Sequence, residues 1–241
     1  MFPMLLSLLP LLSGTAALAA PVVSPVAGPH AMRVRATGMV DLQATHVIEK
    51  DCTGTQCAAW DQRTFSGLDL ELALARGLAI HGDVGRLRDH ISEADFDTRG
   101  LGWRLGLRGA LPLTRTHQWW AAAQADLGGA DPGDVGPTAP KSHLLDLSVG
   151  AQLCWGDPDG GFVGYLGGQA APYWQQSVSP MGPDGLELVL QPKLPASAVA
   201  GFAFSSTPLG SSWKHSPRAV AHVEARAGQS MGAGVGLGLA W

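Results

Sequence analysis

Two histidines lie near carboxylates at a spacing that places them on one face of a β-strand. His81 stands two residues before Asp83, and His222 begins an alternating series that continues with Glu224 and Arg226. Side chains at this spacing in a strand point the same way, so each carboxylate could orient its histidine as a general base. Neither histidine has a serine nucleophile at a recognisable spacing. We interpret both groups as parts of a buried ion-pair network and assign no catalytic residue.

An acidic stretch offers carboxylate oxygens, the ligand type that Ca²⁺ prefers. Its carboxylates are Asp89, Glu93, Asp95 and Asp97. The spacing and the turn glycine of a calcium-binding loop are missing, so a solvated acidic loop explains the stretch better.

The glycines of residues 232–238 lack the strand-then-helix context and the lysine of a phosphate-binding loop. They fit a wall that packs around large neighbouring side chains or leaves a shallow groove. Because the sequence contains no phosphate, haem or zinc motif, we expect no cofactor and no metal.

The three cysteines suggest one disulfide. Cys52 and Cys57 flank the segment Thr-Gly-Thr-Gln, and no second pair of cysteines or histidines completes a tetrahedral metal site nearby. In an oxidising compartment we expect these two to pair. Cys154 lies in an alternating run, where we expect it to pack as a small residue instead of acting as a nucleophile.

The composition indicates a glycine-rich β protein that is poor in charge. Lysine and arginine number 16 against 20 aspartates and glutamates, so the chain has no basic surplus for nucleic acid. Hydrophobic residues make up 46% of the chain and charged residues 15%, which argues against disorder. The 32 glycines and 17 prolines argue against coiled coils and helical bundles.

The first residues have the pattern of a secretory signal peptide. An apolar stretch runs from Met4 to Leu12, and Ala17-Leu18-Ala19 fits the pattern of a cleavage site. The stretch is too short to span a membrane as an anchor. The n-region departs from the signal-peptide pattern in having no lysine or arginine. We therefore expect a signal peptide at 1–19, a short N-terminal segment at 20–30 and one β domain at 31–241.

Apolar and polar residues alternate with period two along most of the remaining chain, which is typical of strands. Ten runs of this kind are present, and prolines fall outside them or at their ends, as expected for a sheet. The runs are 33–45, 67–74, 78–88, 100–111, 119–127, 145–155, 162–171, 196–204, 218–227 and 231–241. Long and short connections alternate, as in membrane barrels. The alternation fails at 206–216 and 228–230, so eight strands remain an alternative.

The two faces of these strands favour a membrane barrel over a soluble one. One face is rich in Leu, Ala and Val, and the other carries arginines together with aspartates and glutamates. Aromatic residues collect at the strand ends, as the interfacial girdles of a membrane barrel require. We expect one girdle to contain Phe65, Trp103, Tyr173 and Trp174, and the other Trp119, Trp155, Phe202, Phe204 and Trp241.

In these features the chain resembles the small outer-membrane β-barrel proteins of Gram-negative bacteria, over most of residues 31–241. In that family a terminal aromatic, an apolar residue two before it and a glycine five before it form an assembly signal. Trp241, Leu239 and Gly236 occupy those places, whereas Gly234 replaces the usual polar residue. The resemblance implies location in the outer membrane, contact with its lipid, and recognition by the barrel-assembly machinery and periplasmic chaperones. It implies no particular function.

We therefore expect an all-β fold: a closed antiparallel transmembrane β-barrel, an up-and-down meander of ten strands. Its lumen should be polar and largely filled, and the protein should be monomeric. The leading hypothesis is a non-enzymatic role in envelope structure or in surface interaction through extracellular loops. Three alternatives remain: a narrow, porin-like channel for ions or small solutes, a membrane-embedded hydrolase, and a soluble secreted barrel that binds an apolar ligand. The channel predicts a conductance that falls when Arg104 or Arg108 is replaced by a bulkier neutral residue.

Overall fold

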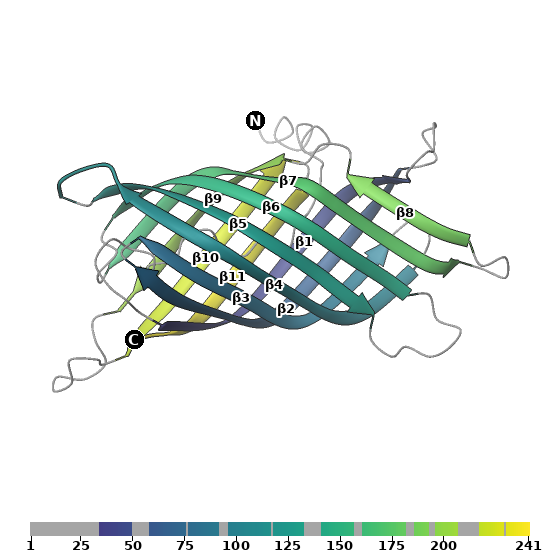
Figure 1. Ribbon diagram of the computed structural model, residues 1–241, viewed down its shortest axis with the longest axis horizontal. Coiled ribbons are helices and arrows are strands. Elements are labelled where there is room, and N and C mark those ends of the chain that lie inside the picture. The colour runs from purple at the N-terminus through teal and green to yellow at the C-terminus, as the bar shows by residue number, and fades with distance from the viewer. Residues whose placement is uncertain are drawn as a thin grey trace, which may run out of the picture.

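Eleven strands form one antiparallel sheet in the described part of the chain (Figure 1). The computed structural model describes residues 34–49, 58–75, 77–91, 96–116, 118–132, 141–156, 161–181, 186–192, 196–206, 217–228 and 230–241. The strands are β1 (Val34–Glu49), β2 (Ala58–Ala75), β3 (Leu78–Ile91), β4 (Phe96–Pro112), β5 (Trp119–Pro132), β6 (Lys141–Gly156), β7 (Phe162–Met181), β8 (Leu186–Pro192), β9 (Ala196–Ser205), β10 (Arg218–Gly228) and β11 (Ser230–Ala240). Among these residues no helix is long and apolar enough to cross a bilayer.

The sheet closes because its last strand pairs with its first. β11 lies beside β1 from the pair Arg35–Ala240 to the pair Thr45–Ser230. The amide of Val34 donates to the carbonyl of Trp241 at 3.1 Å, and the reverse bond measures 2.8 Å. We call this end of the barrel the C-terminal rim. β1 to β7 and β9 to β11 each pair with their neighbours, which confirms the predicted ten-stranded meander and excludes the eight-stranded alternative for the body.

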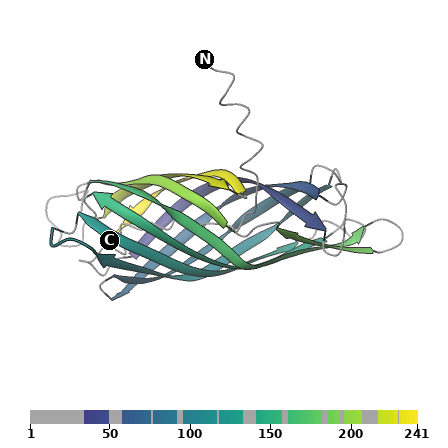
Figure 2. The same cartoon turned by 90° about the horizontal axis from the view of Figure 1, so that it is seen from above.

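The short strand β8 lies outside the ten predicted runs and is found at the opposite rim, which we call the β8 rim (Figures 1 and 2). The first half of β7 pairs with β9, whereas residues 176–181 pair with β8. β8 in turn pairs with residues 47–49 of β1. β9, β10 and β11 are shorter than β7 and β1, so the long strands would otherwise project with bare edges. β8 covers both edges by pairing with β7 and β1. The barrel wall therefore consists of eight strands at this rim and ten in the body.

The outer face of the barrel is apolar over most of the length of the described strands. Among the described residues thirty large hydrophobic side chains are exposed, and most are the leucines and valines of the alternating runs, such as Leu70, Leu105 and Leu237. The alternate positions on the same strands point into the lumen and are largely polar or charged. A soluble barrel would have the reverse arrangement, so the soluble alternative is wrong. A closed sheet with this exterior satisfies every backbone group internally, as a membrane requires.

Aromatic side chains confirm one predicted girdle and correct the other. At the C-terminal rim the rings of Trp119 and Trp155 lie 5.9 Å apart, and those of Phe162 and Phe202 lie 5.0 Å apart. Toward the β8 rim Phe65 and Trp174 are each only 4% exposed, because both point into the lumen. Their assignment to a girdle was wrong. Tyr173 does face outward, and Trp103 is partly exposed on the outer face.

A β-bulge in β7 explains the orientation of Trp174. Between the pairs Leu147–Tyr173 and Val149–Ala170, β7 contains one more residue than β6. An extra residue exchanges the two faces of the strand beyond it, so Trp174 turns inward and Tyr173 outward. Pro172 lies at the bulge, where a missing backbone donor is tolerated.

Candidate functional site: the charged lumen

The lumen gathers the charged residues that the sequence placed on the polar faces. Among the described residues it buries five arginines and nine carboxylates, together with His81 and His222. The arginines are Arg35, Arg63, Arg104, Arg108 and Arg226. The carboxylates are Asp41, Asp61, Asp69, Glu71, Asp83, Asp89, Asp126, Asp146 and Glu224. Buried charges are costly unless they are paired, so their arrangement decides what the lumen can do.

One ion-pair group lies on β1, β2 and β4. Arg35 binds the Oδ2 atom of Asp69 and lies 3.2 Å from Glu71. Arg108 donates from Nη1 to the same carboxylate of Glu71 at 2.6 Å, and its Nε lies 3.4 Å from the amide oxygen of Gln124. The group therefore joins side chains across several strands and occupies the lumen between them.

A second group fastens the seam at which the barrel closes. The Nη1 atom of Arg226 on β10 donates to Asp41 on β1 at 2.9 Å, passing over the intervening strand β11. Arg226 also donates from Nε to Glu224 at 2.7 Å. The hydroxyl of Tyr165 on β7 donates to the other oxygen of Glu224 at 3.1 Å. These contacts link β1, β10 and β7 from inside the barrel.

A third group fills the lumen near the β8 rim. Arg63 lies 2.6 Å from Asp61 and donates from Nε to Asp89 at 3.1 Å. It also donates to Gln176 at 2.8 Å, and its guanidinium lies 5.2 Å from the centre of the Trp174 ring. A cation over the face of an indole ring is attracted by the ring quadrupole, so Trp174 adds to the binding of this arginine.

The prediction that Asp89 belongs to a solvated acidic loop is wrong. β3 continues to Ile91, so Asp89 lies on its lumen face and is 3% exposed. Asp97, by contrast, is exposed and lies 3.3 Å from Arg88 and 3.2 Å from His90. Glu93 and Asp95 lie outside the described residues.

The lumen histidines are buried as predicted, but their partners differ from those that the spacing suggests. The Nε2 atom of His81 lies 2.6 Å from Asp126 on β5, whereas Asp83 binds Arg104 at 3.2 Å. The Nε2 atom of His222 has no hydrogen-bond partner. Ser148, the residue opposite Asp126 on β6, also has an unpartnered hydroxyl. The described contacts therefore form an ion-pair network and contain no hydrogen bond from Ser148 to either histidine.

Glycines allow several of these contacts to pass over a strand. Asp126 reaches His81 across Gly106, where an added Cβ would collide with both side chains. Tyr165 reaches Glu224 across Gly201 in the same way. The imidazole of His222 covers Gly236, within the glycine-rich segment of β11. The wall thus packs closely around large lumen side chains, as one of the two interpretations of residues 232–238 predicted.

The cysteines fall into two groups. Cys154 is free and buried in an apolar cluster with Trp120, Tyr165 and Val199, so it packs as a small residue. Cys52 and Cys57 lie outside the described residues, as do the expected signal peptide at 1–19 and the segment at 20–30, so these predictions remain untested.

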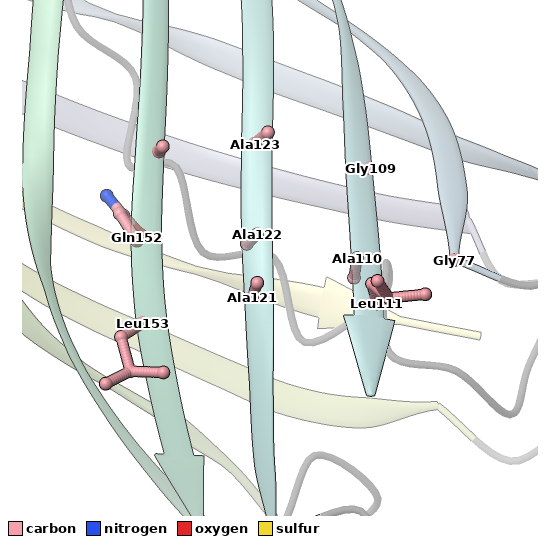
Figure 3. A pocket seen from close by; sticks show the side chains of 10 residues that line it. Gly77, Gly109, Ala110, Leu111, Ala121, Ala122, Ala123, Gln152 and Leu153 are labelled. Atoms are coloured by element: carbon pink, nitrogen blue, oxygen red, sulfur yellow. The ribbon is translucent and has the colours of Figure 1, made fainter. Parts of the chain in front are cut away.

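The outer wall has a shallow depression over β4, β5 and β6 (Figure 3). Its volume is about 570 Å³. Small side chains form its floor, and Leu111 and Leu153 stand at its margins. The lining residues are Gly77, Gly109, Ala110, Leu111, Ala121, Ala122, Ala123, Ala151, Gln152 and Leu153. Because the lining carries no charge, this depression offers no catalytic or ionic groups.

Together, the closed pairing, the apolar exterior and the charged interior define a transmembrane β-barrel of ten strands. No known family model matches the sequence, and no curated protein does either. The structure is similar to the translocator domain of the autotransporter NalP from Neisseria meningitidis, with a TM-score of 0.46 and 9% identity over 88% of this chain and 89% of that one. It is also similar to the Pseudomonas putida toluene transporter TodX, with a TM-score of 0.32 and 10% identity over 95% and 93%. A third similar structure is Ail, the attachment invasion locus protein of Yersinia pestis, with a TM-score of 0.28 and 10% identity over 86% and 99%.

Proposed function

We propose that this protein is an outer-membrane barrel with a filled lumen, whose role is structural or adhesive and is carried by its extracellular connections. The observation that supports this proposal is the set of ion pairs that joins the walls of the lumen. Arg35, Arg108 and Arg226 are each about 1–4% exposed and hold carboxylates from neighbouring or more distant strands. Side chains engaged in this way leave no wide aqueous path.

Apolar packing supports the same proposal. One buried cluster contains Trp120, Cys154 and Tyr165 with their neighbours. A smaller one contains Ala73, Val220 and Ala240. Because Ala240 adjoins Trp241 and Ala73 lies near the end of β2, this cluster lies at the C-terminal rim. Water and ions that enter at the β8 rim would have to pass both the charged network and this apolar packing.

The location and the partners belong to the same proposal. We place the barrel in the outer membrane, with the C-terminal rim toward the periplasm, as a monomer in contact with lipid. We further propose that β11, which ends at Trp241 and closes the barrel against β1, is the segment that the assembly machinery recognises.

A narrow channel for cations is the second candidate. The nine buried carboxylates outnumber the five buried arginines among the described residues, and neither oxygen of Asp146 has a hydrogen-bond partner. An excess of carboxylates in a lumen attracts cations and repels anions. This candidate differs from the first in requiring a continuous aqueous path.

Planar-bilayer recording of the refolded protein distinguishes the two candidates. The filled lumen predicts no unitary conductance for the wild type, and open events in the variant R35A/R108A, which removes two side chains from the network. The control L105A changes a lipid-facing side chain and should stay silent. Stable cation-selective steps in the wild type would overturn the filled barrel and establish the channel. Only preparations whose band shifts on heating in SDS are recorded, so that misfolded protein does not enter the comparison.

A further inference from the structure

We propose that Asp69, His81 and Asp83 form a binding site for a divalent transition-metal ion inside the lumen. Each of the three offers one ligand atom, and these atoms lie within 4.8 Å of one another. All three side chains are buried, with exposures of 0%, 1% and 5%. Asp69 on β2 lies directly opposite Asp83 on β3, and His81 is two residues away on the same face. These residues lie in the lumen whether it is filled or conducting, so the site does not depend on the function proposed above.

Each of the three residues has one atom engaged by the protein and one that is unpartnered. Asp69 binds Arg35 through Oδ2, Asp83 binds Arg104 through Oδ2, and His81 contacts Asp126 through Nε2. The remaining Oδ1 of Asp69, Oδ1 of Asp83 and Nδ1 of His81 are buried without a hydrogen-bond partner. Buried polar atoms are rarely left in this condition, because each loses the hydrogen bonds that water would give it.

An independent observation comes from the neighbouring strand. Thr37 on β1 lies opposite Asp69, is fully buried, and has a hydroxyl without a partner. A hydroxyl next to a carboxylate at this register belongs to the same region of the lumen. It adds an unpartnered polar oxygen beside the three residues, as expected around an ion or the water molecules that such an ion holds.

The donor set suits a transition metal. Because Asp126 accepts a hydrogen bond from Nε2 of His81, Nδ1 is the nitrogen that keeps a lone pair. A carboxylate behind a histidine is the usual outer support of a metal ligand. Two carboxylates and one imidazole bind first-row divalent ions and leave further positions for water. Such ligands lie about 2.0–2.2 Å from the ion, so the three side chains would draw inward on binding.

The surrounding charge is also favourable. The carboxylates Asp69, Glu71, Asp83 and Asp126 face the guanidinium groups of Arg35, Arg104 and Arg108. With a neutral histidine this group carries one uncompensated negative charge, and a buried uncompensated charge is costly. This net negative charge attracts a cation to the region of the three residues.

The test is metal binding by the untagged barrel refolded in detergent with Co²⁺ or with Zn²⁺, followed by gel filtration in metal-free buffer. We expect about one metal per chain by elemental analysis, and a visible d–d absorption band for Co²⁺. The variants H81Q and D83N should each lose the metal and the band. The matched control H222Q changes the other buried lumen histidine, whose Nε2 is also unpartnered, and should bind as the wild type does.

Three outcomes overturn the proposal. A folded wild-type barrel that retains no metal means that water alone fills the region. Equal retention by H81Q, D83N and wild type means that the ion binds elsewhere, for example at Cys52 and Cys57, and a C52S/C57S variant then loses it. If H222Q loses the metal as H81Q does, the loss reflects a general disturbance of the lumen and gives no support for His81 as a ligand. Two substitutions at separate ligands keep the test valid if one of them prevents folding.

Discussion

Lumen side chains in this barrel reach partners two strands away, and a glycine on the strand between makes the contact possible. The pairs Tyr165–Glu224 and Asp126–His81 both follow this rule, with Gly201 and Gly106 as the intervening residues. The many glycines of the sequence therefore have a packing role on the lumen face in addition to their roles in turns. The alternation indicated which residues share a face, but it contained no information on contacts across a strand.

Replacement of Gly201 by alanine should destabilise the barrel. The new Cβ would meet the ring of Tyr165 and the carbonyl oxygen of Val223, which leaves the ring no space over the strand. We expect a loss of about 1–3 kcal/mol in the free energy of unfolding. The measurement is a urea titration of the barrel folded in lipid, followed by tryptophan fluorescence. The control G38A adds its Cβ on the open outer face, where the nearest atom is 3.8 Å away, and should change stability by less than about 0.5 kcal/mol. Equal stability of the two variants would show that the Tyr165 contact does not depend on the glycine.

At the scale of the strands, the period-two pattern predicted the ten strands of the body but not their full lengths. β2 begins at Ala58 and β7 runs to Met181, beyond the runs 67–74 and 162–171. Extending the alternation of Leu68 to Leu74 backward would have placed Phe65 on the lumen face. The orientation of Trp174 could not be found in this way, because an unseen bulge reverses the faces. β8 was missed because seven residues in a long connection carry too short a pattern.

Substitution of Val189 by proline should separate the β8 rim from the body of the barrel. Val189 lies in the middle of β8 opposite Ser177 of β7, and proline lacks a backbone donor and is disfavoured inside a paired strand. We expect faster proteolytic cleavage in residues 182–195 of V189P, with an unchanged heat-dependent gel shift. V189T retains the backbone donor and a β-branched side chain, so it should be cleaved as slowly as the wild type. If V189P no longer forms the heat-shifted band, β8 is required for closure of the whole barrel.

The whole molecule combines two arrangements that a soluble protein would not tolerate together. Its described outer surface carries a belt rich in leucine, valine and aromatic side chains, and its interior holds fourteen buried arginine, aspartate and glutamate side chains. The sequence predicted this inversion from strand faces and rim aromatics. It could not predict the engaged partners, such as Arg226 with Asp41, because they are 185 residues apart and meet only when β11 closes the sheet.

Nitroxide accessibility along β4 in lipid vesicles shows directly whether the leucine rows of the barrel face lipid. Single cysteines replace Arg99, Leu101, Leu105 or Leu107 in a background whose three native cysteines are alanine. All four positions are exposed on the outer face, and Arg99 lies nearest to the β8 rim. We expect labels at Leu101, Leu105 and Leu107 to collide with oxygen and to be shielded from a water-soluble nickel chelate, whereas the label at Arg99 meets the chelate. Equal access of the chelate to Leu105 and Arg99 would contradict a barrel whose leucine rows face lipid.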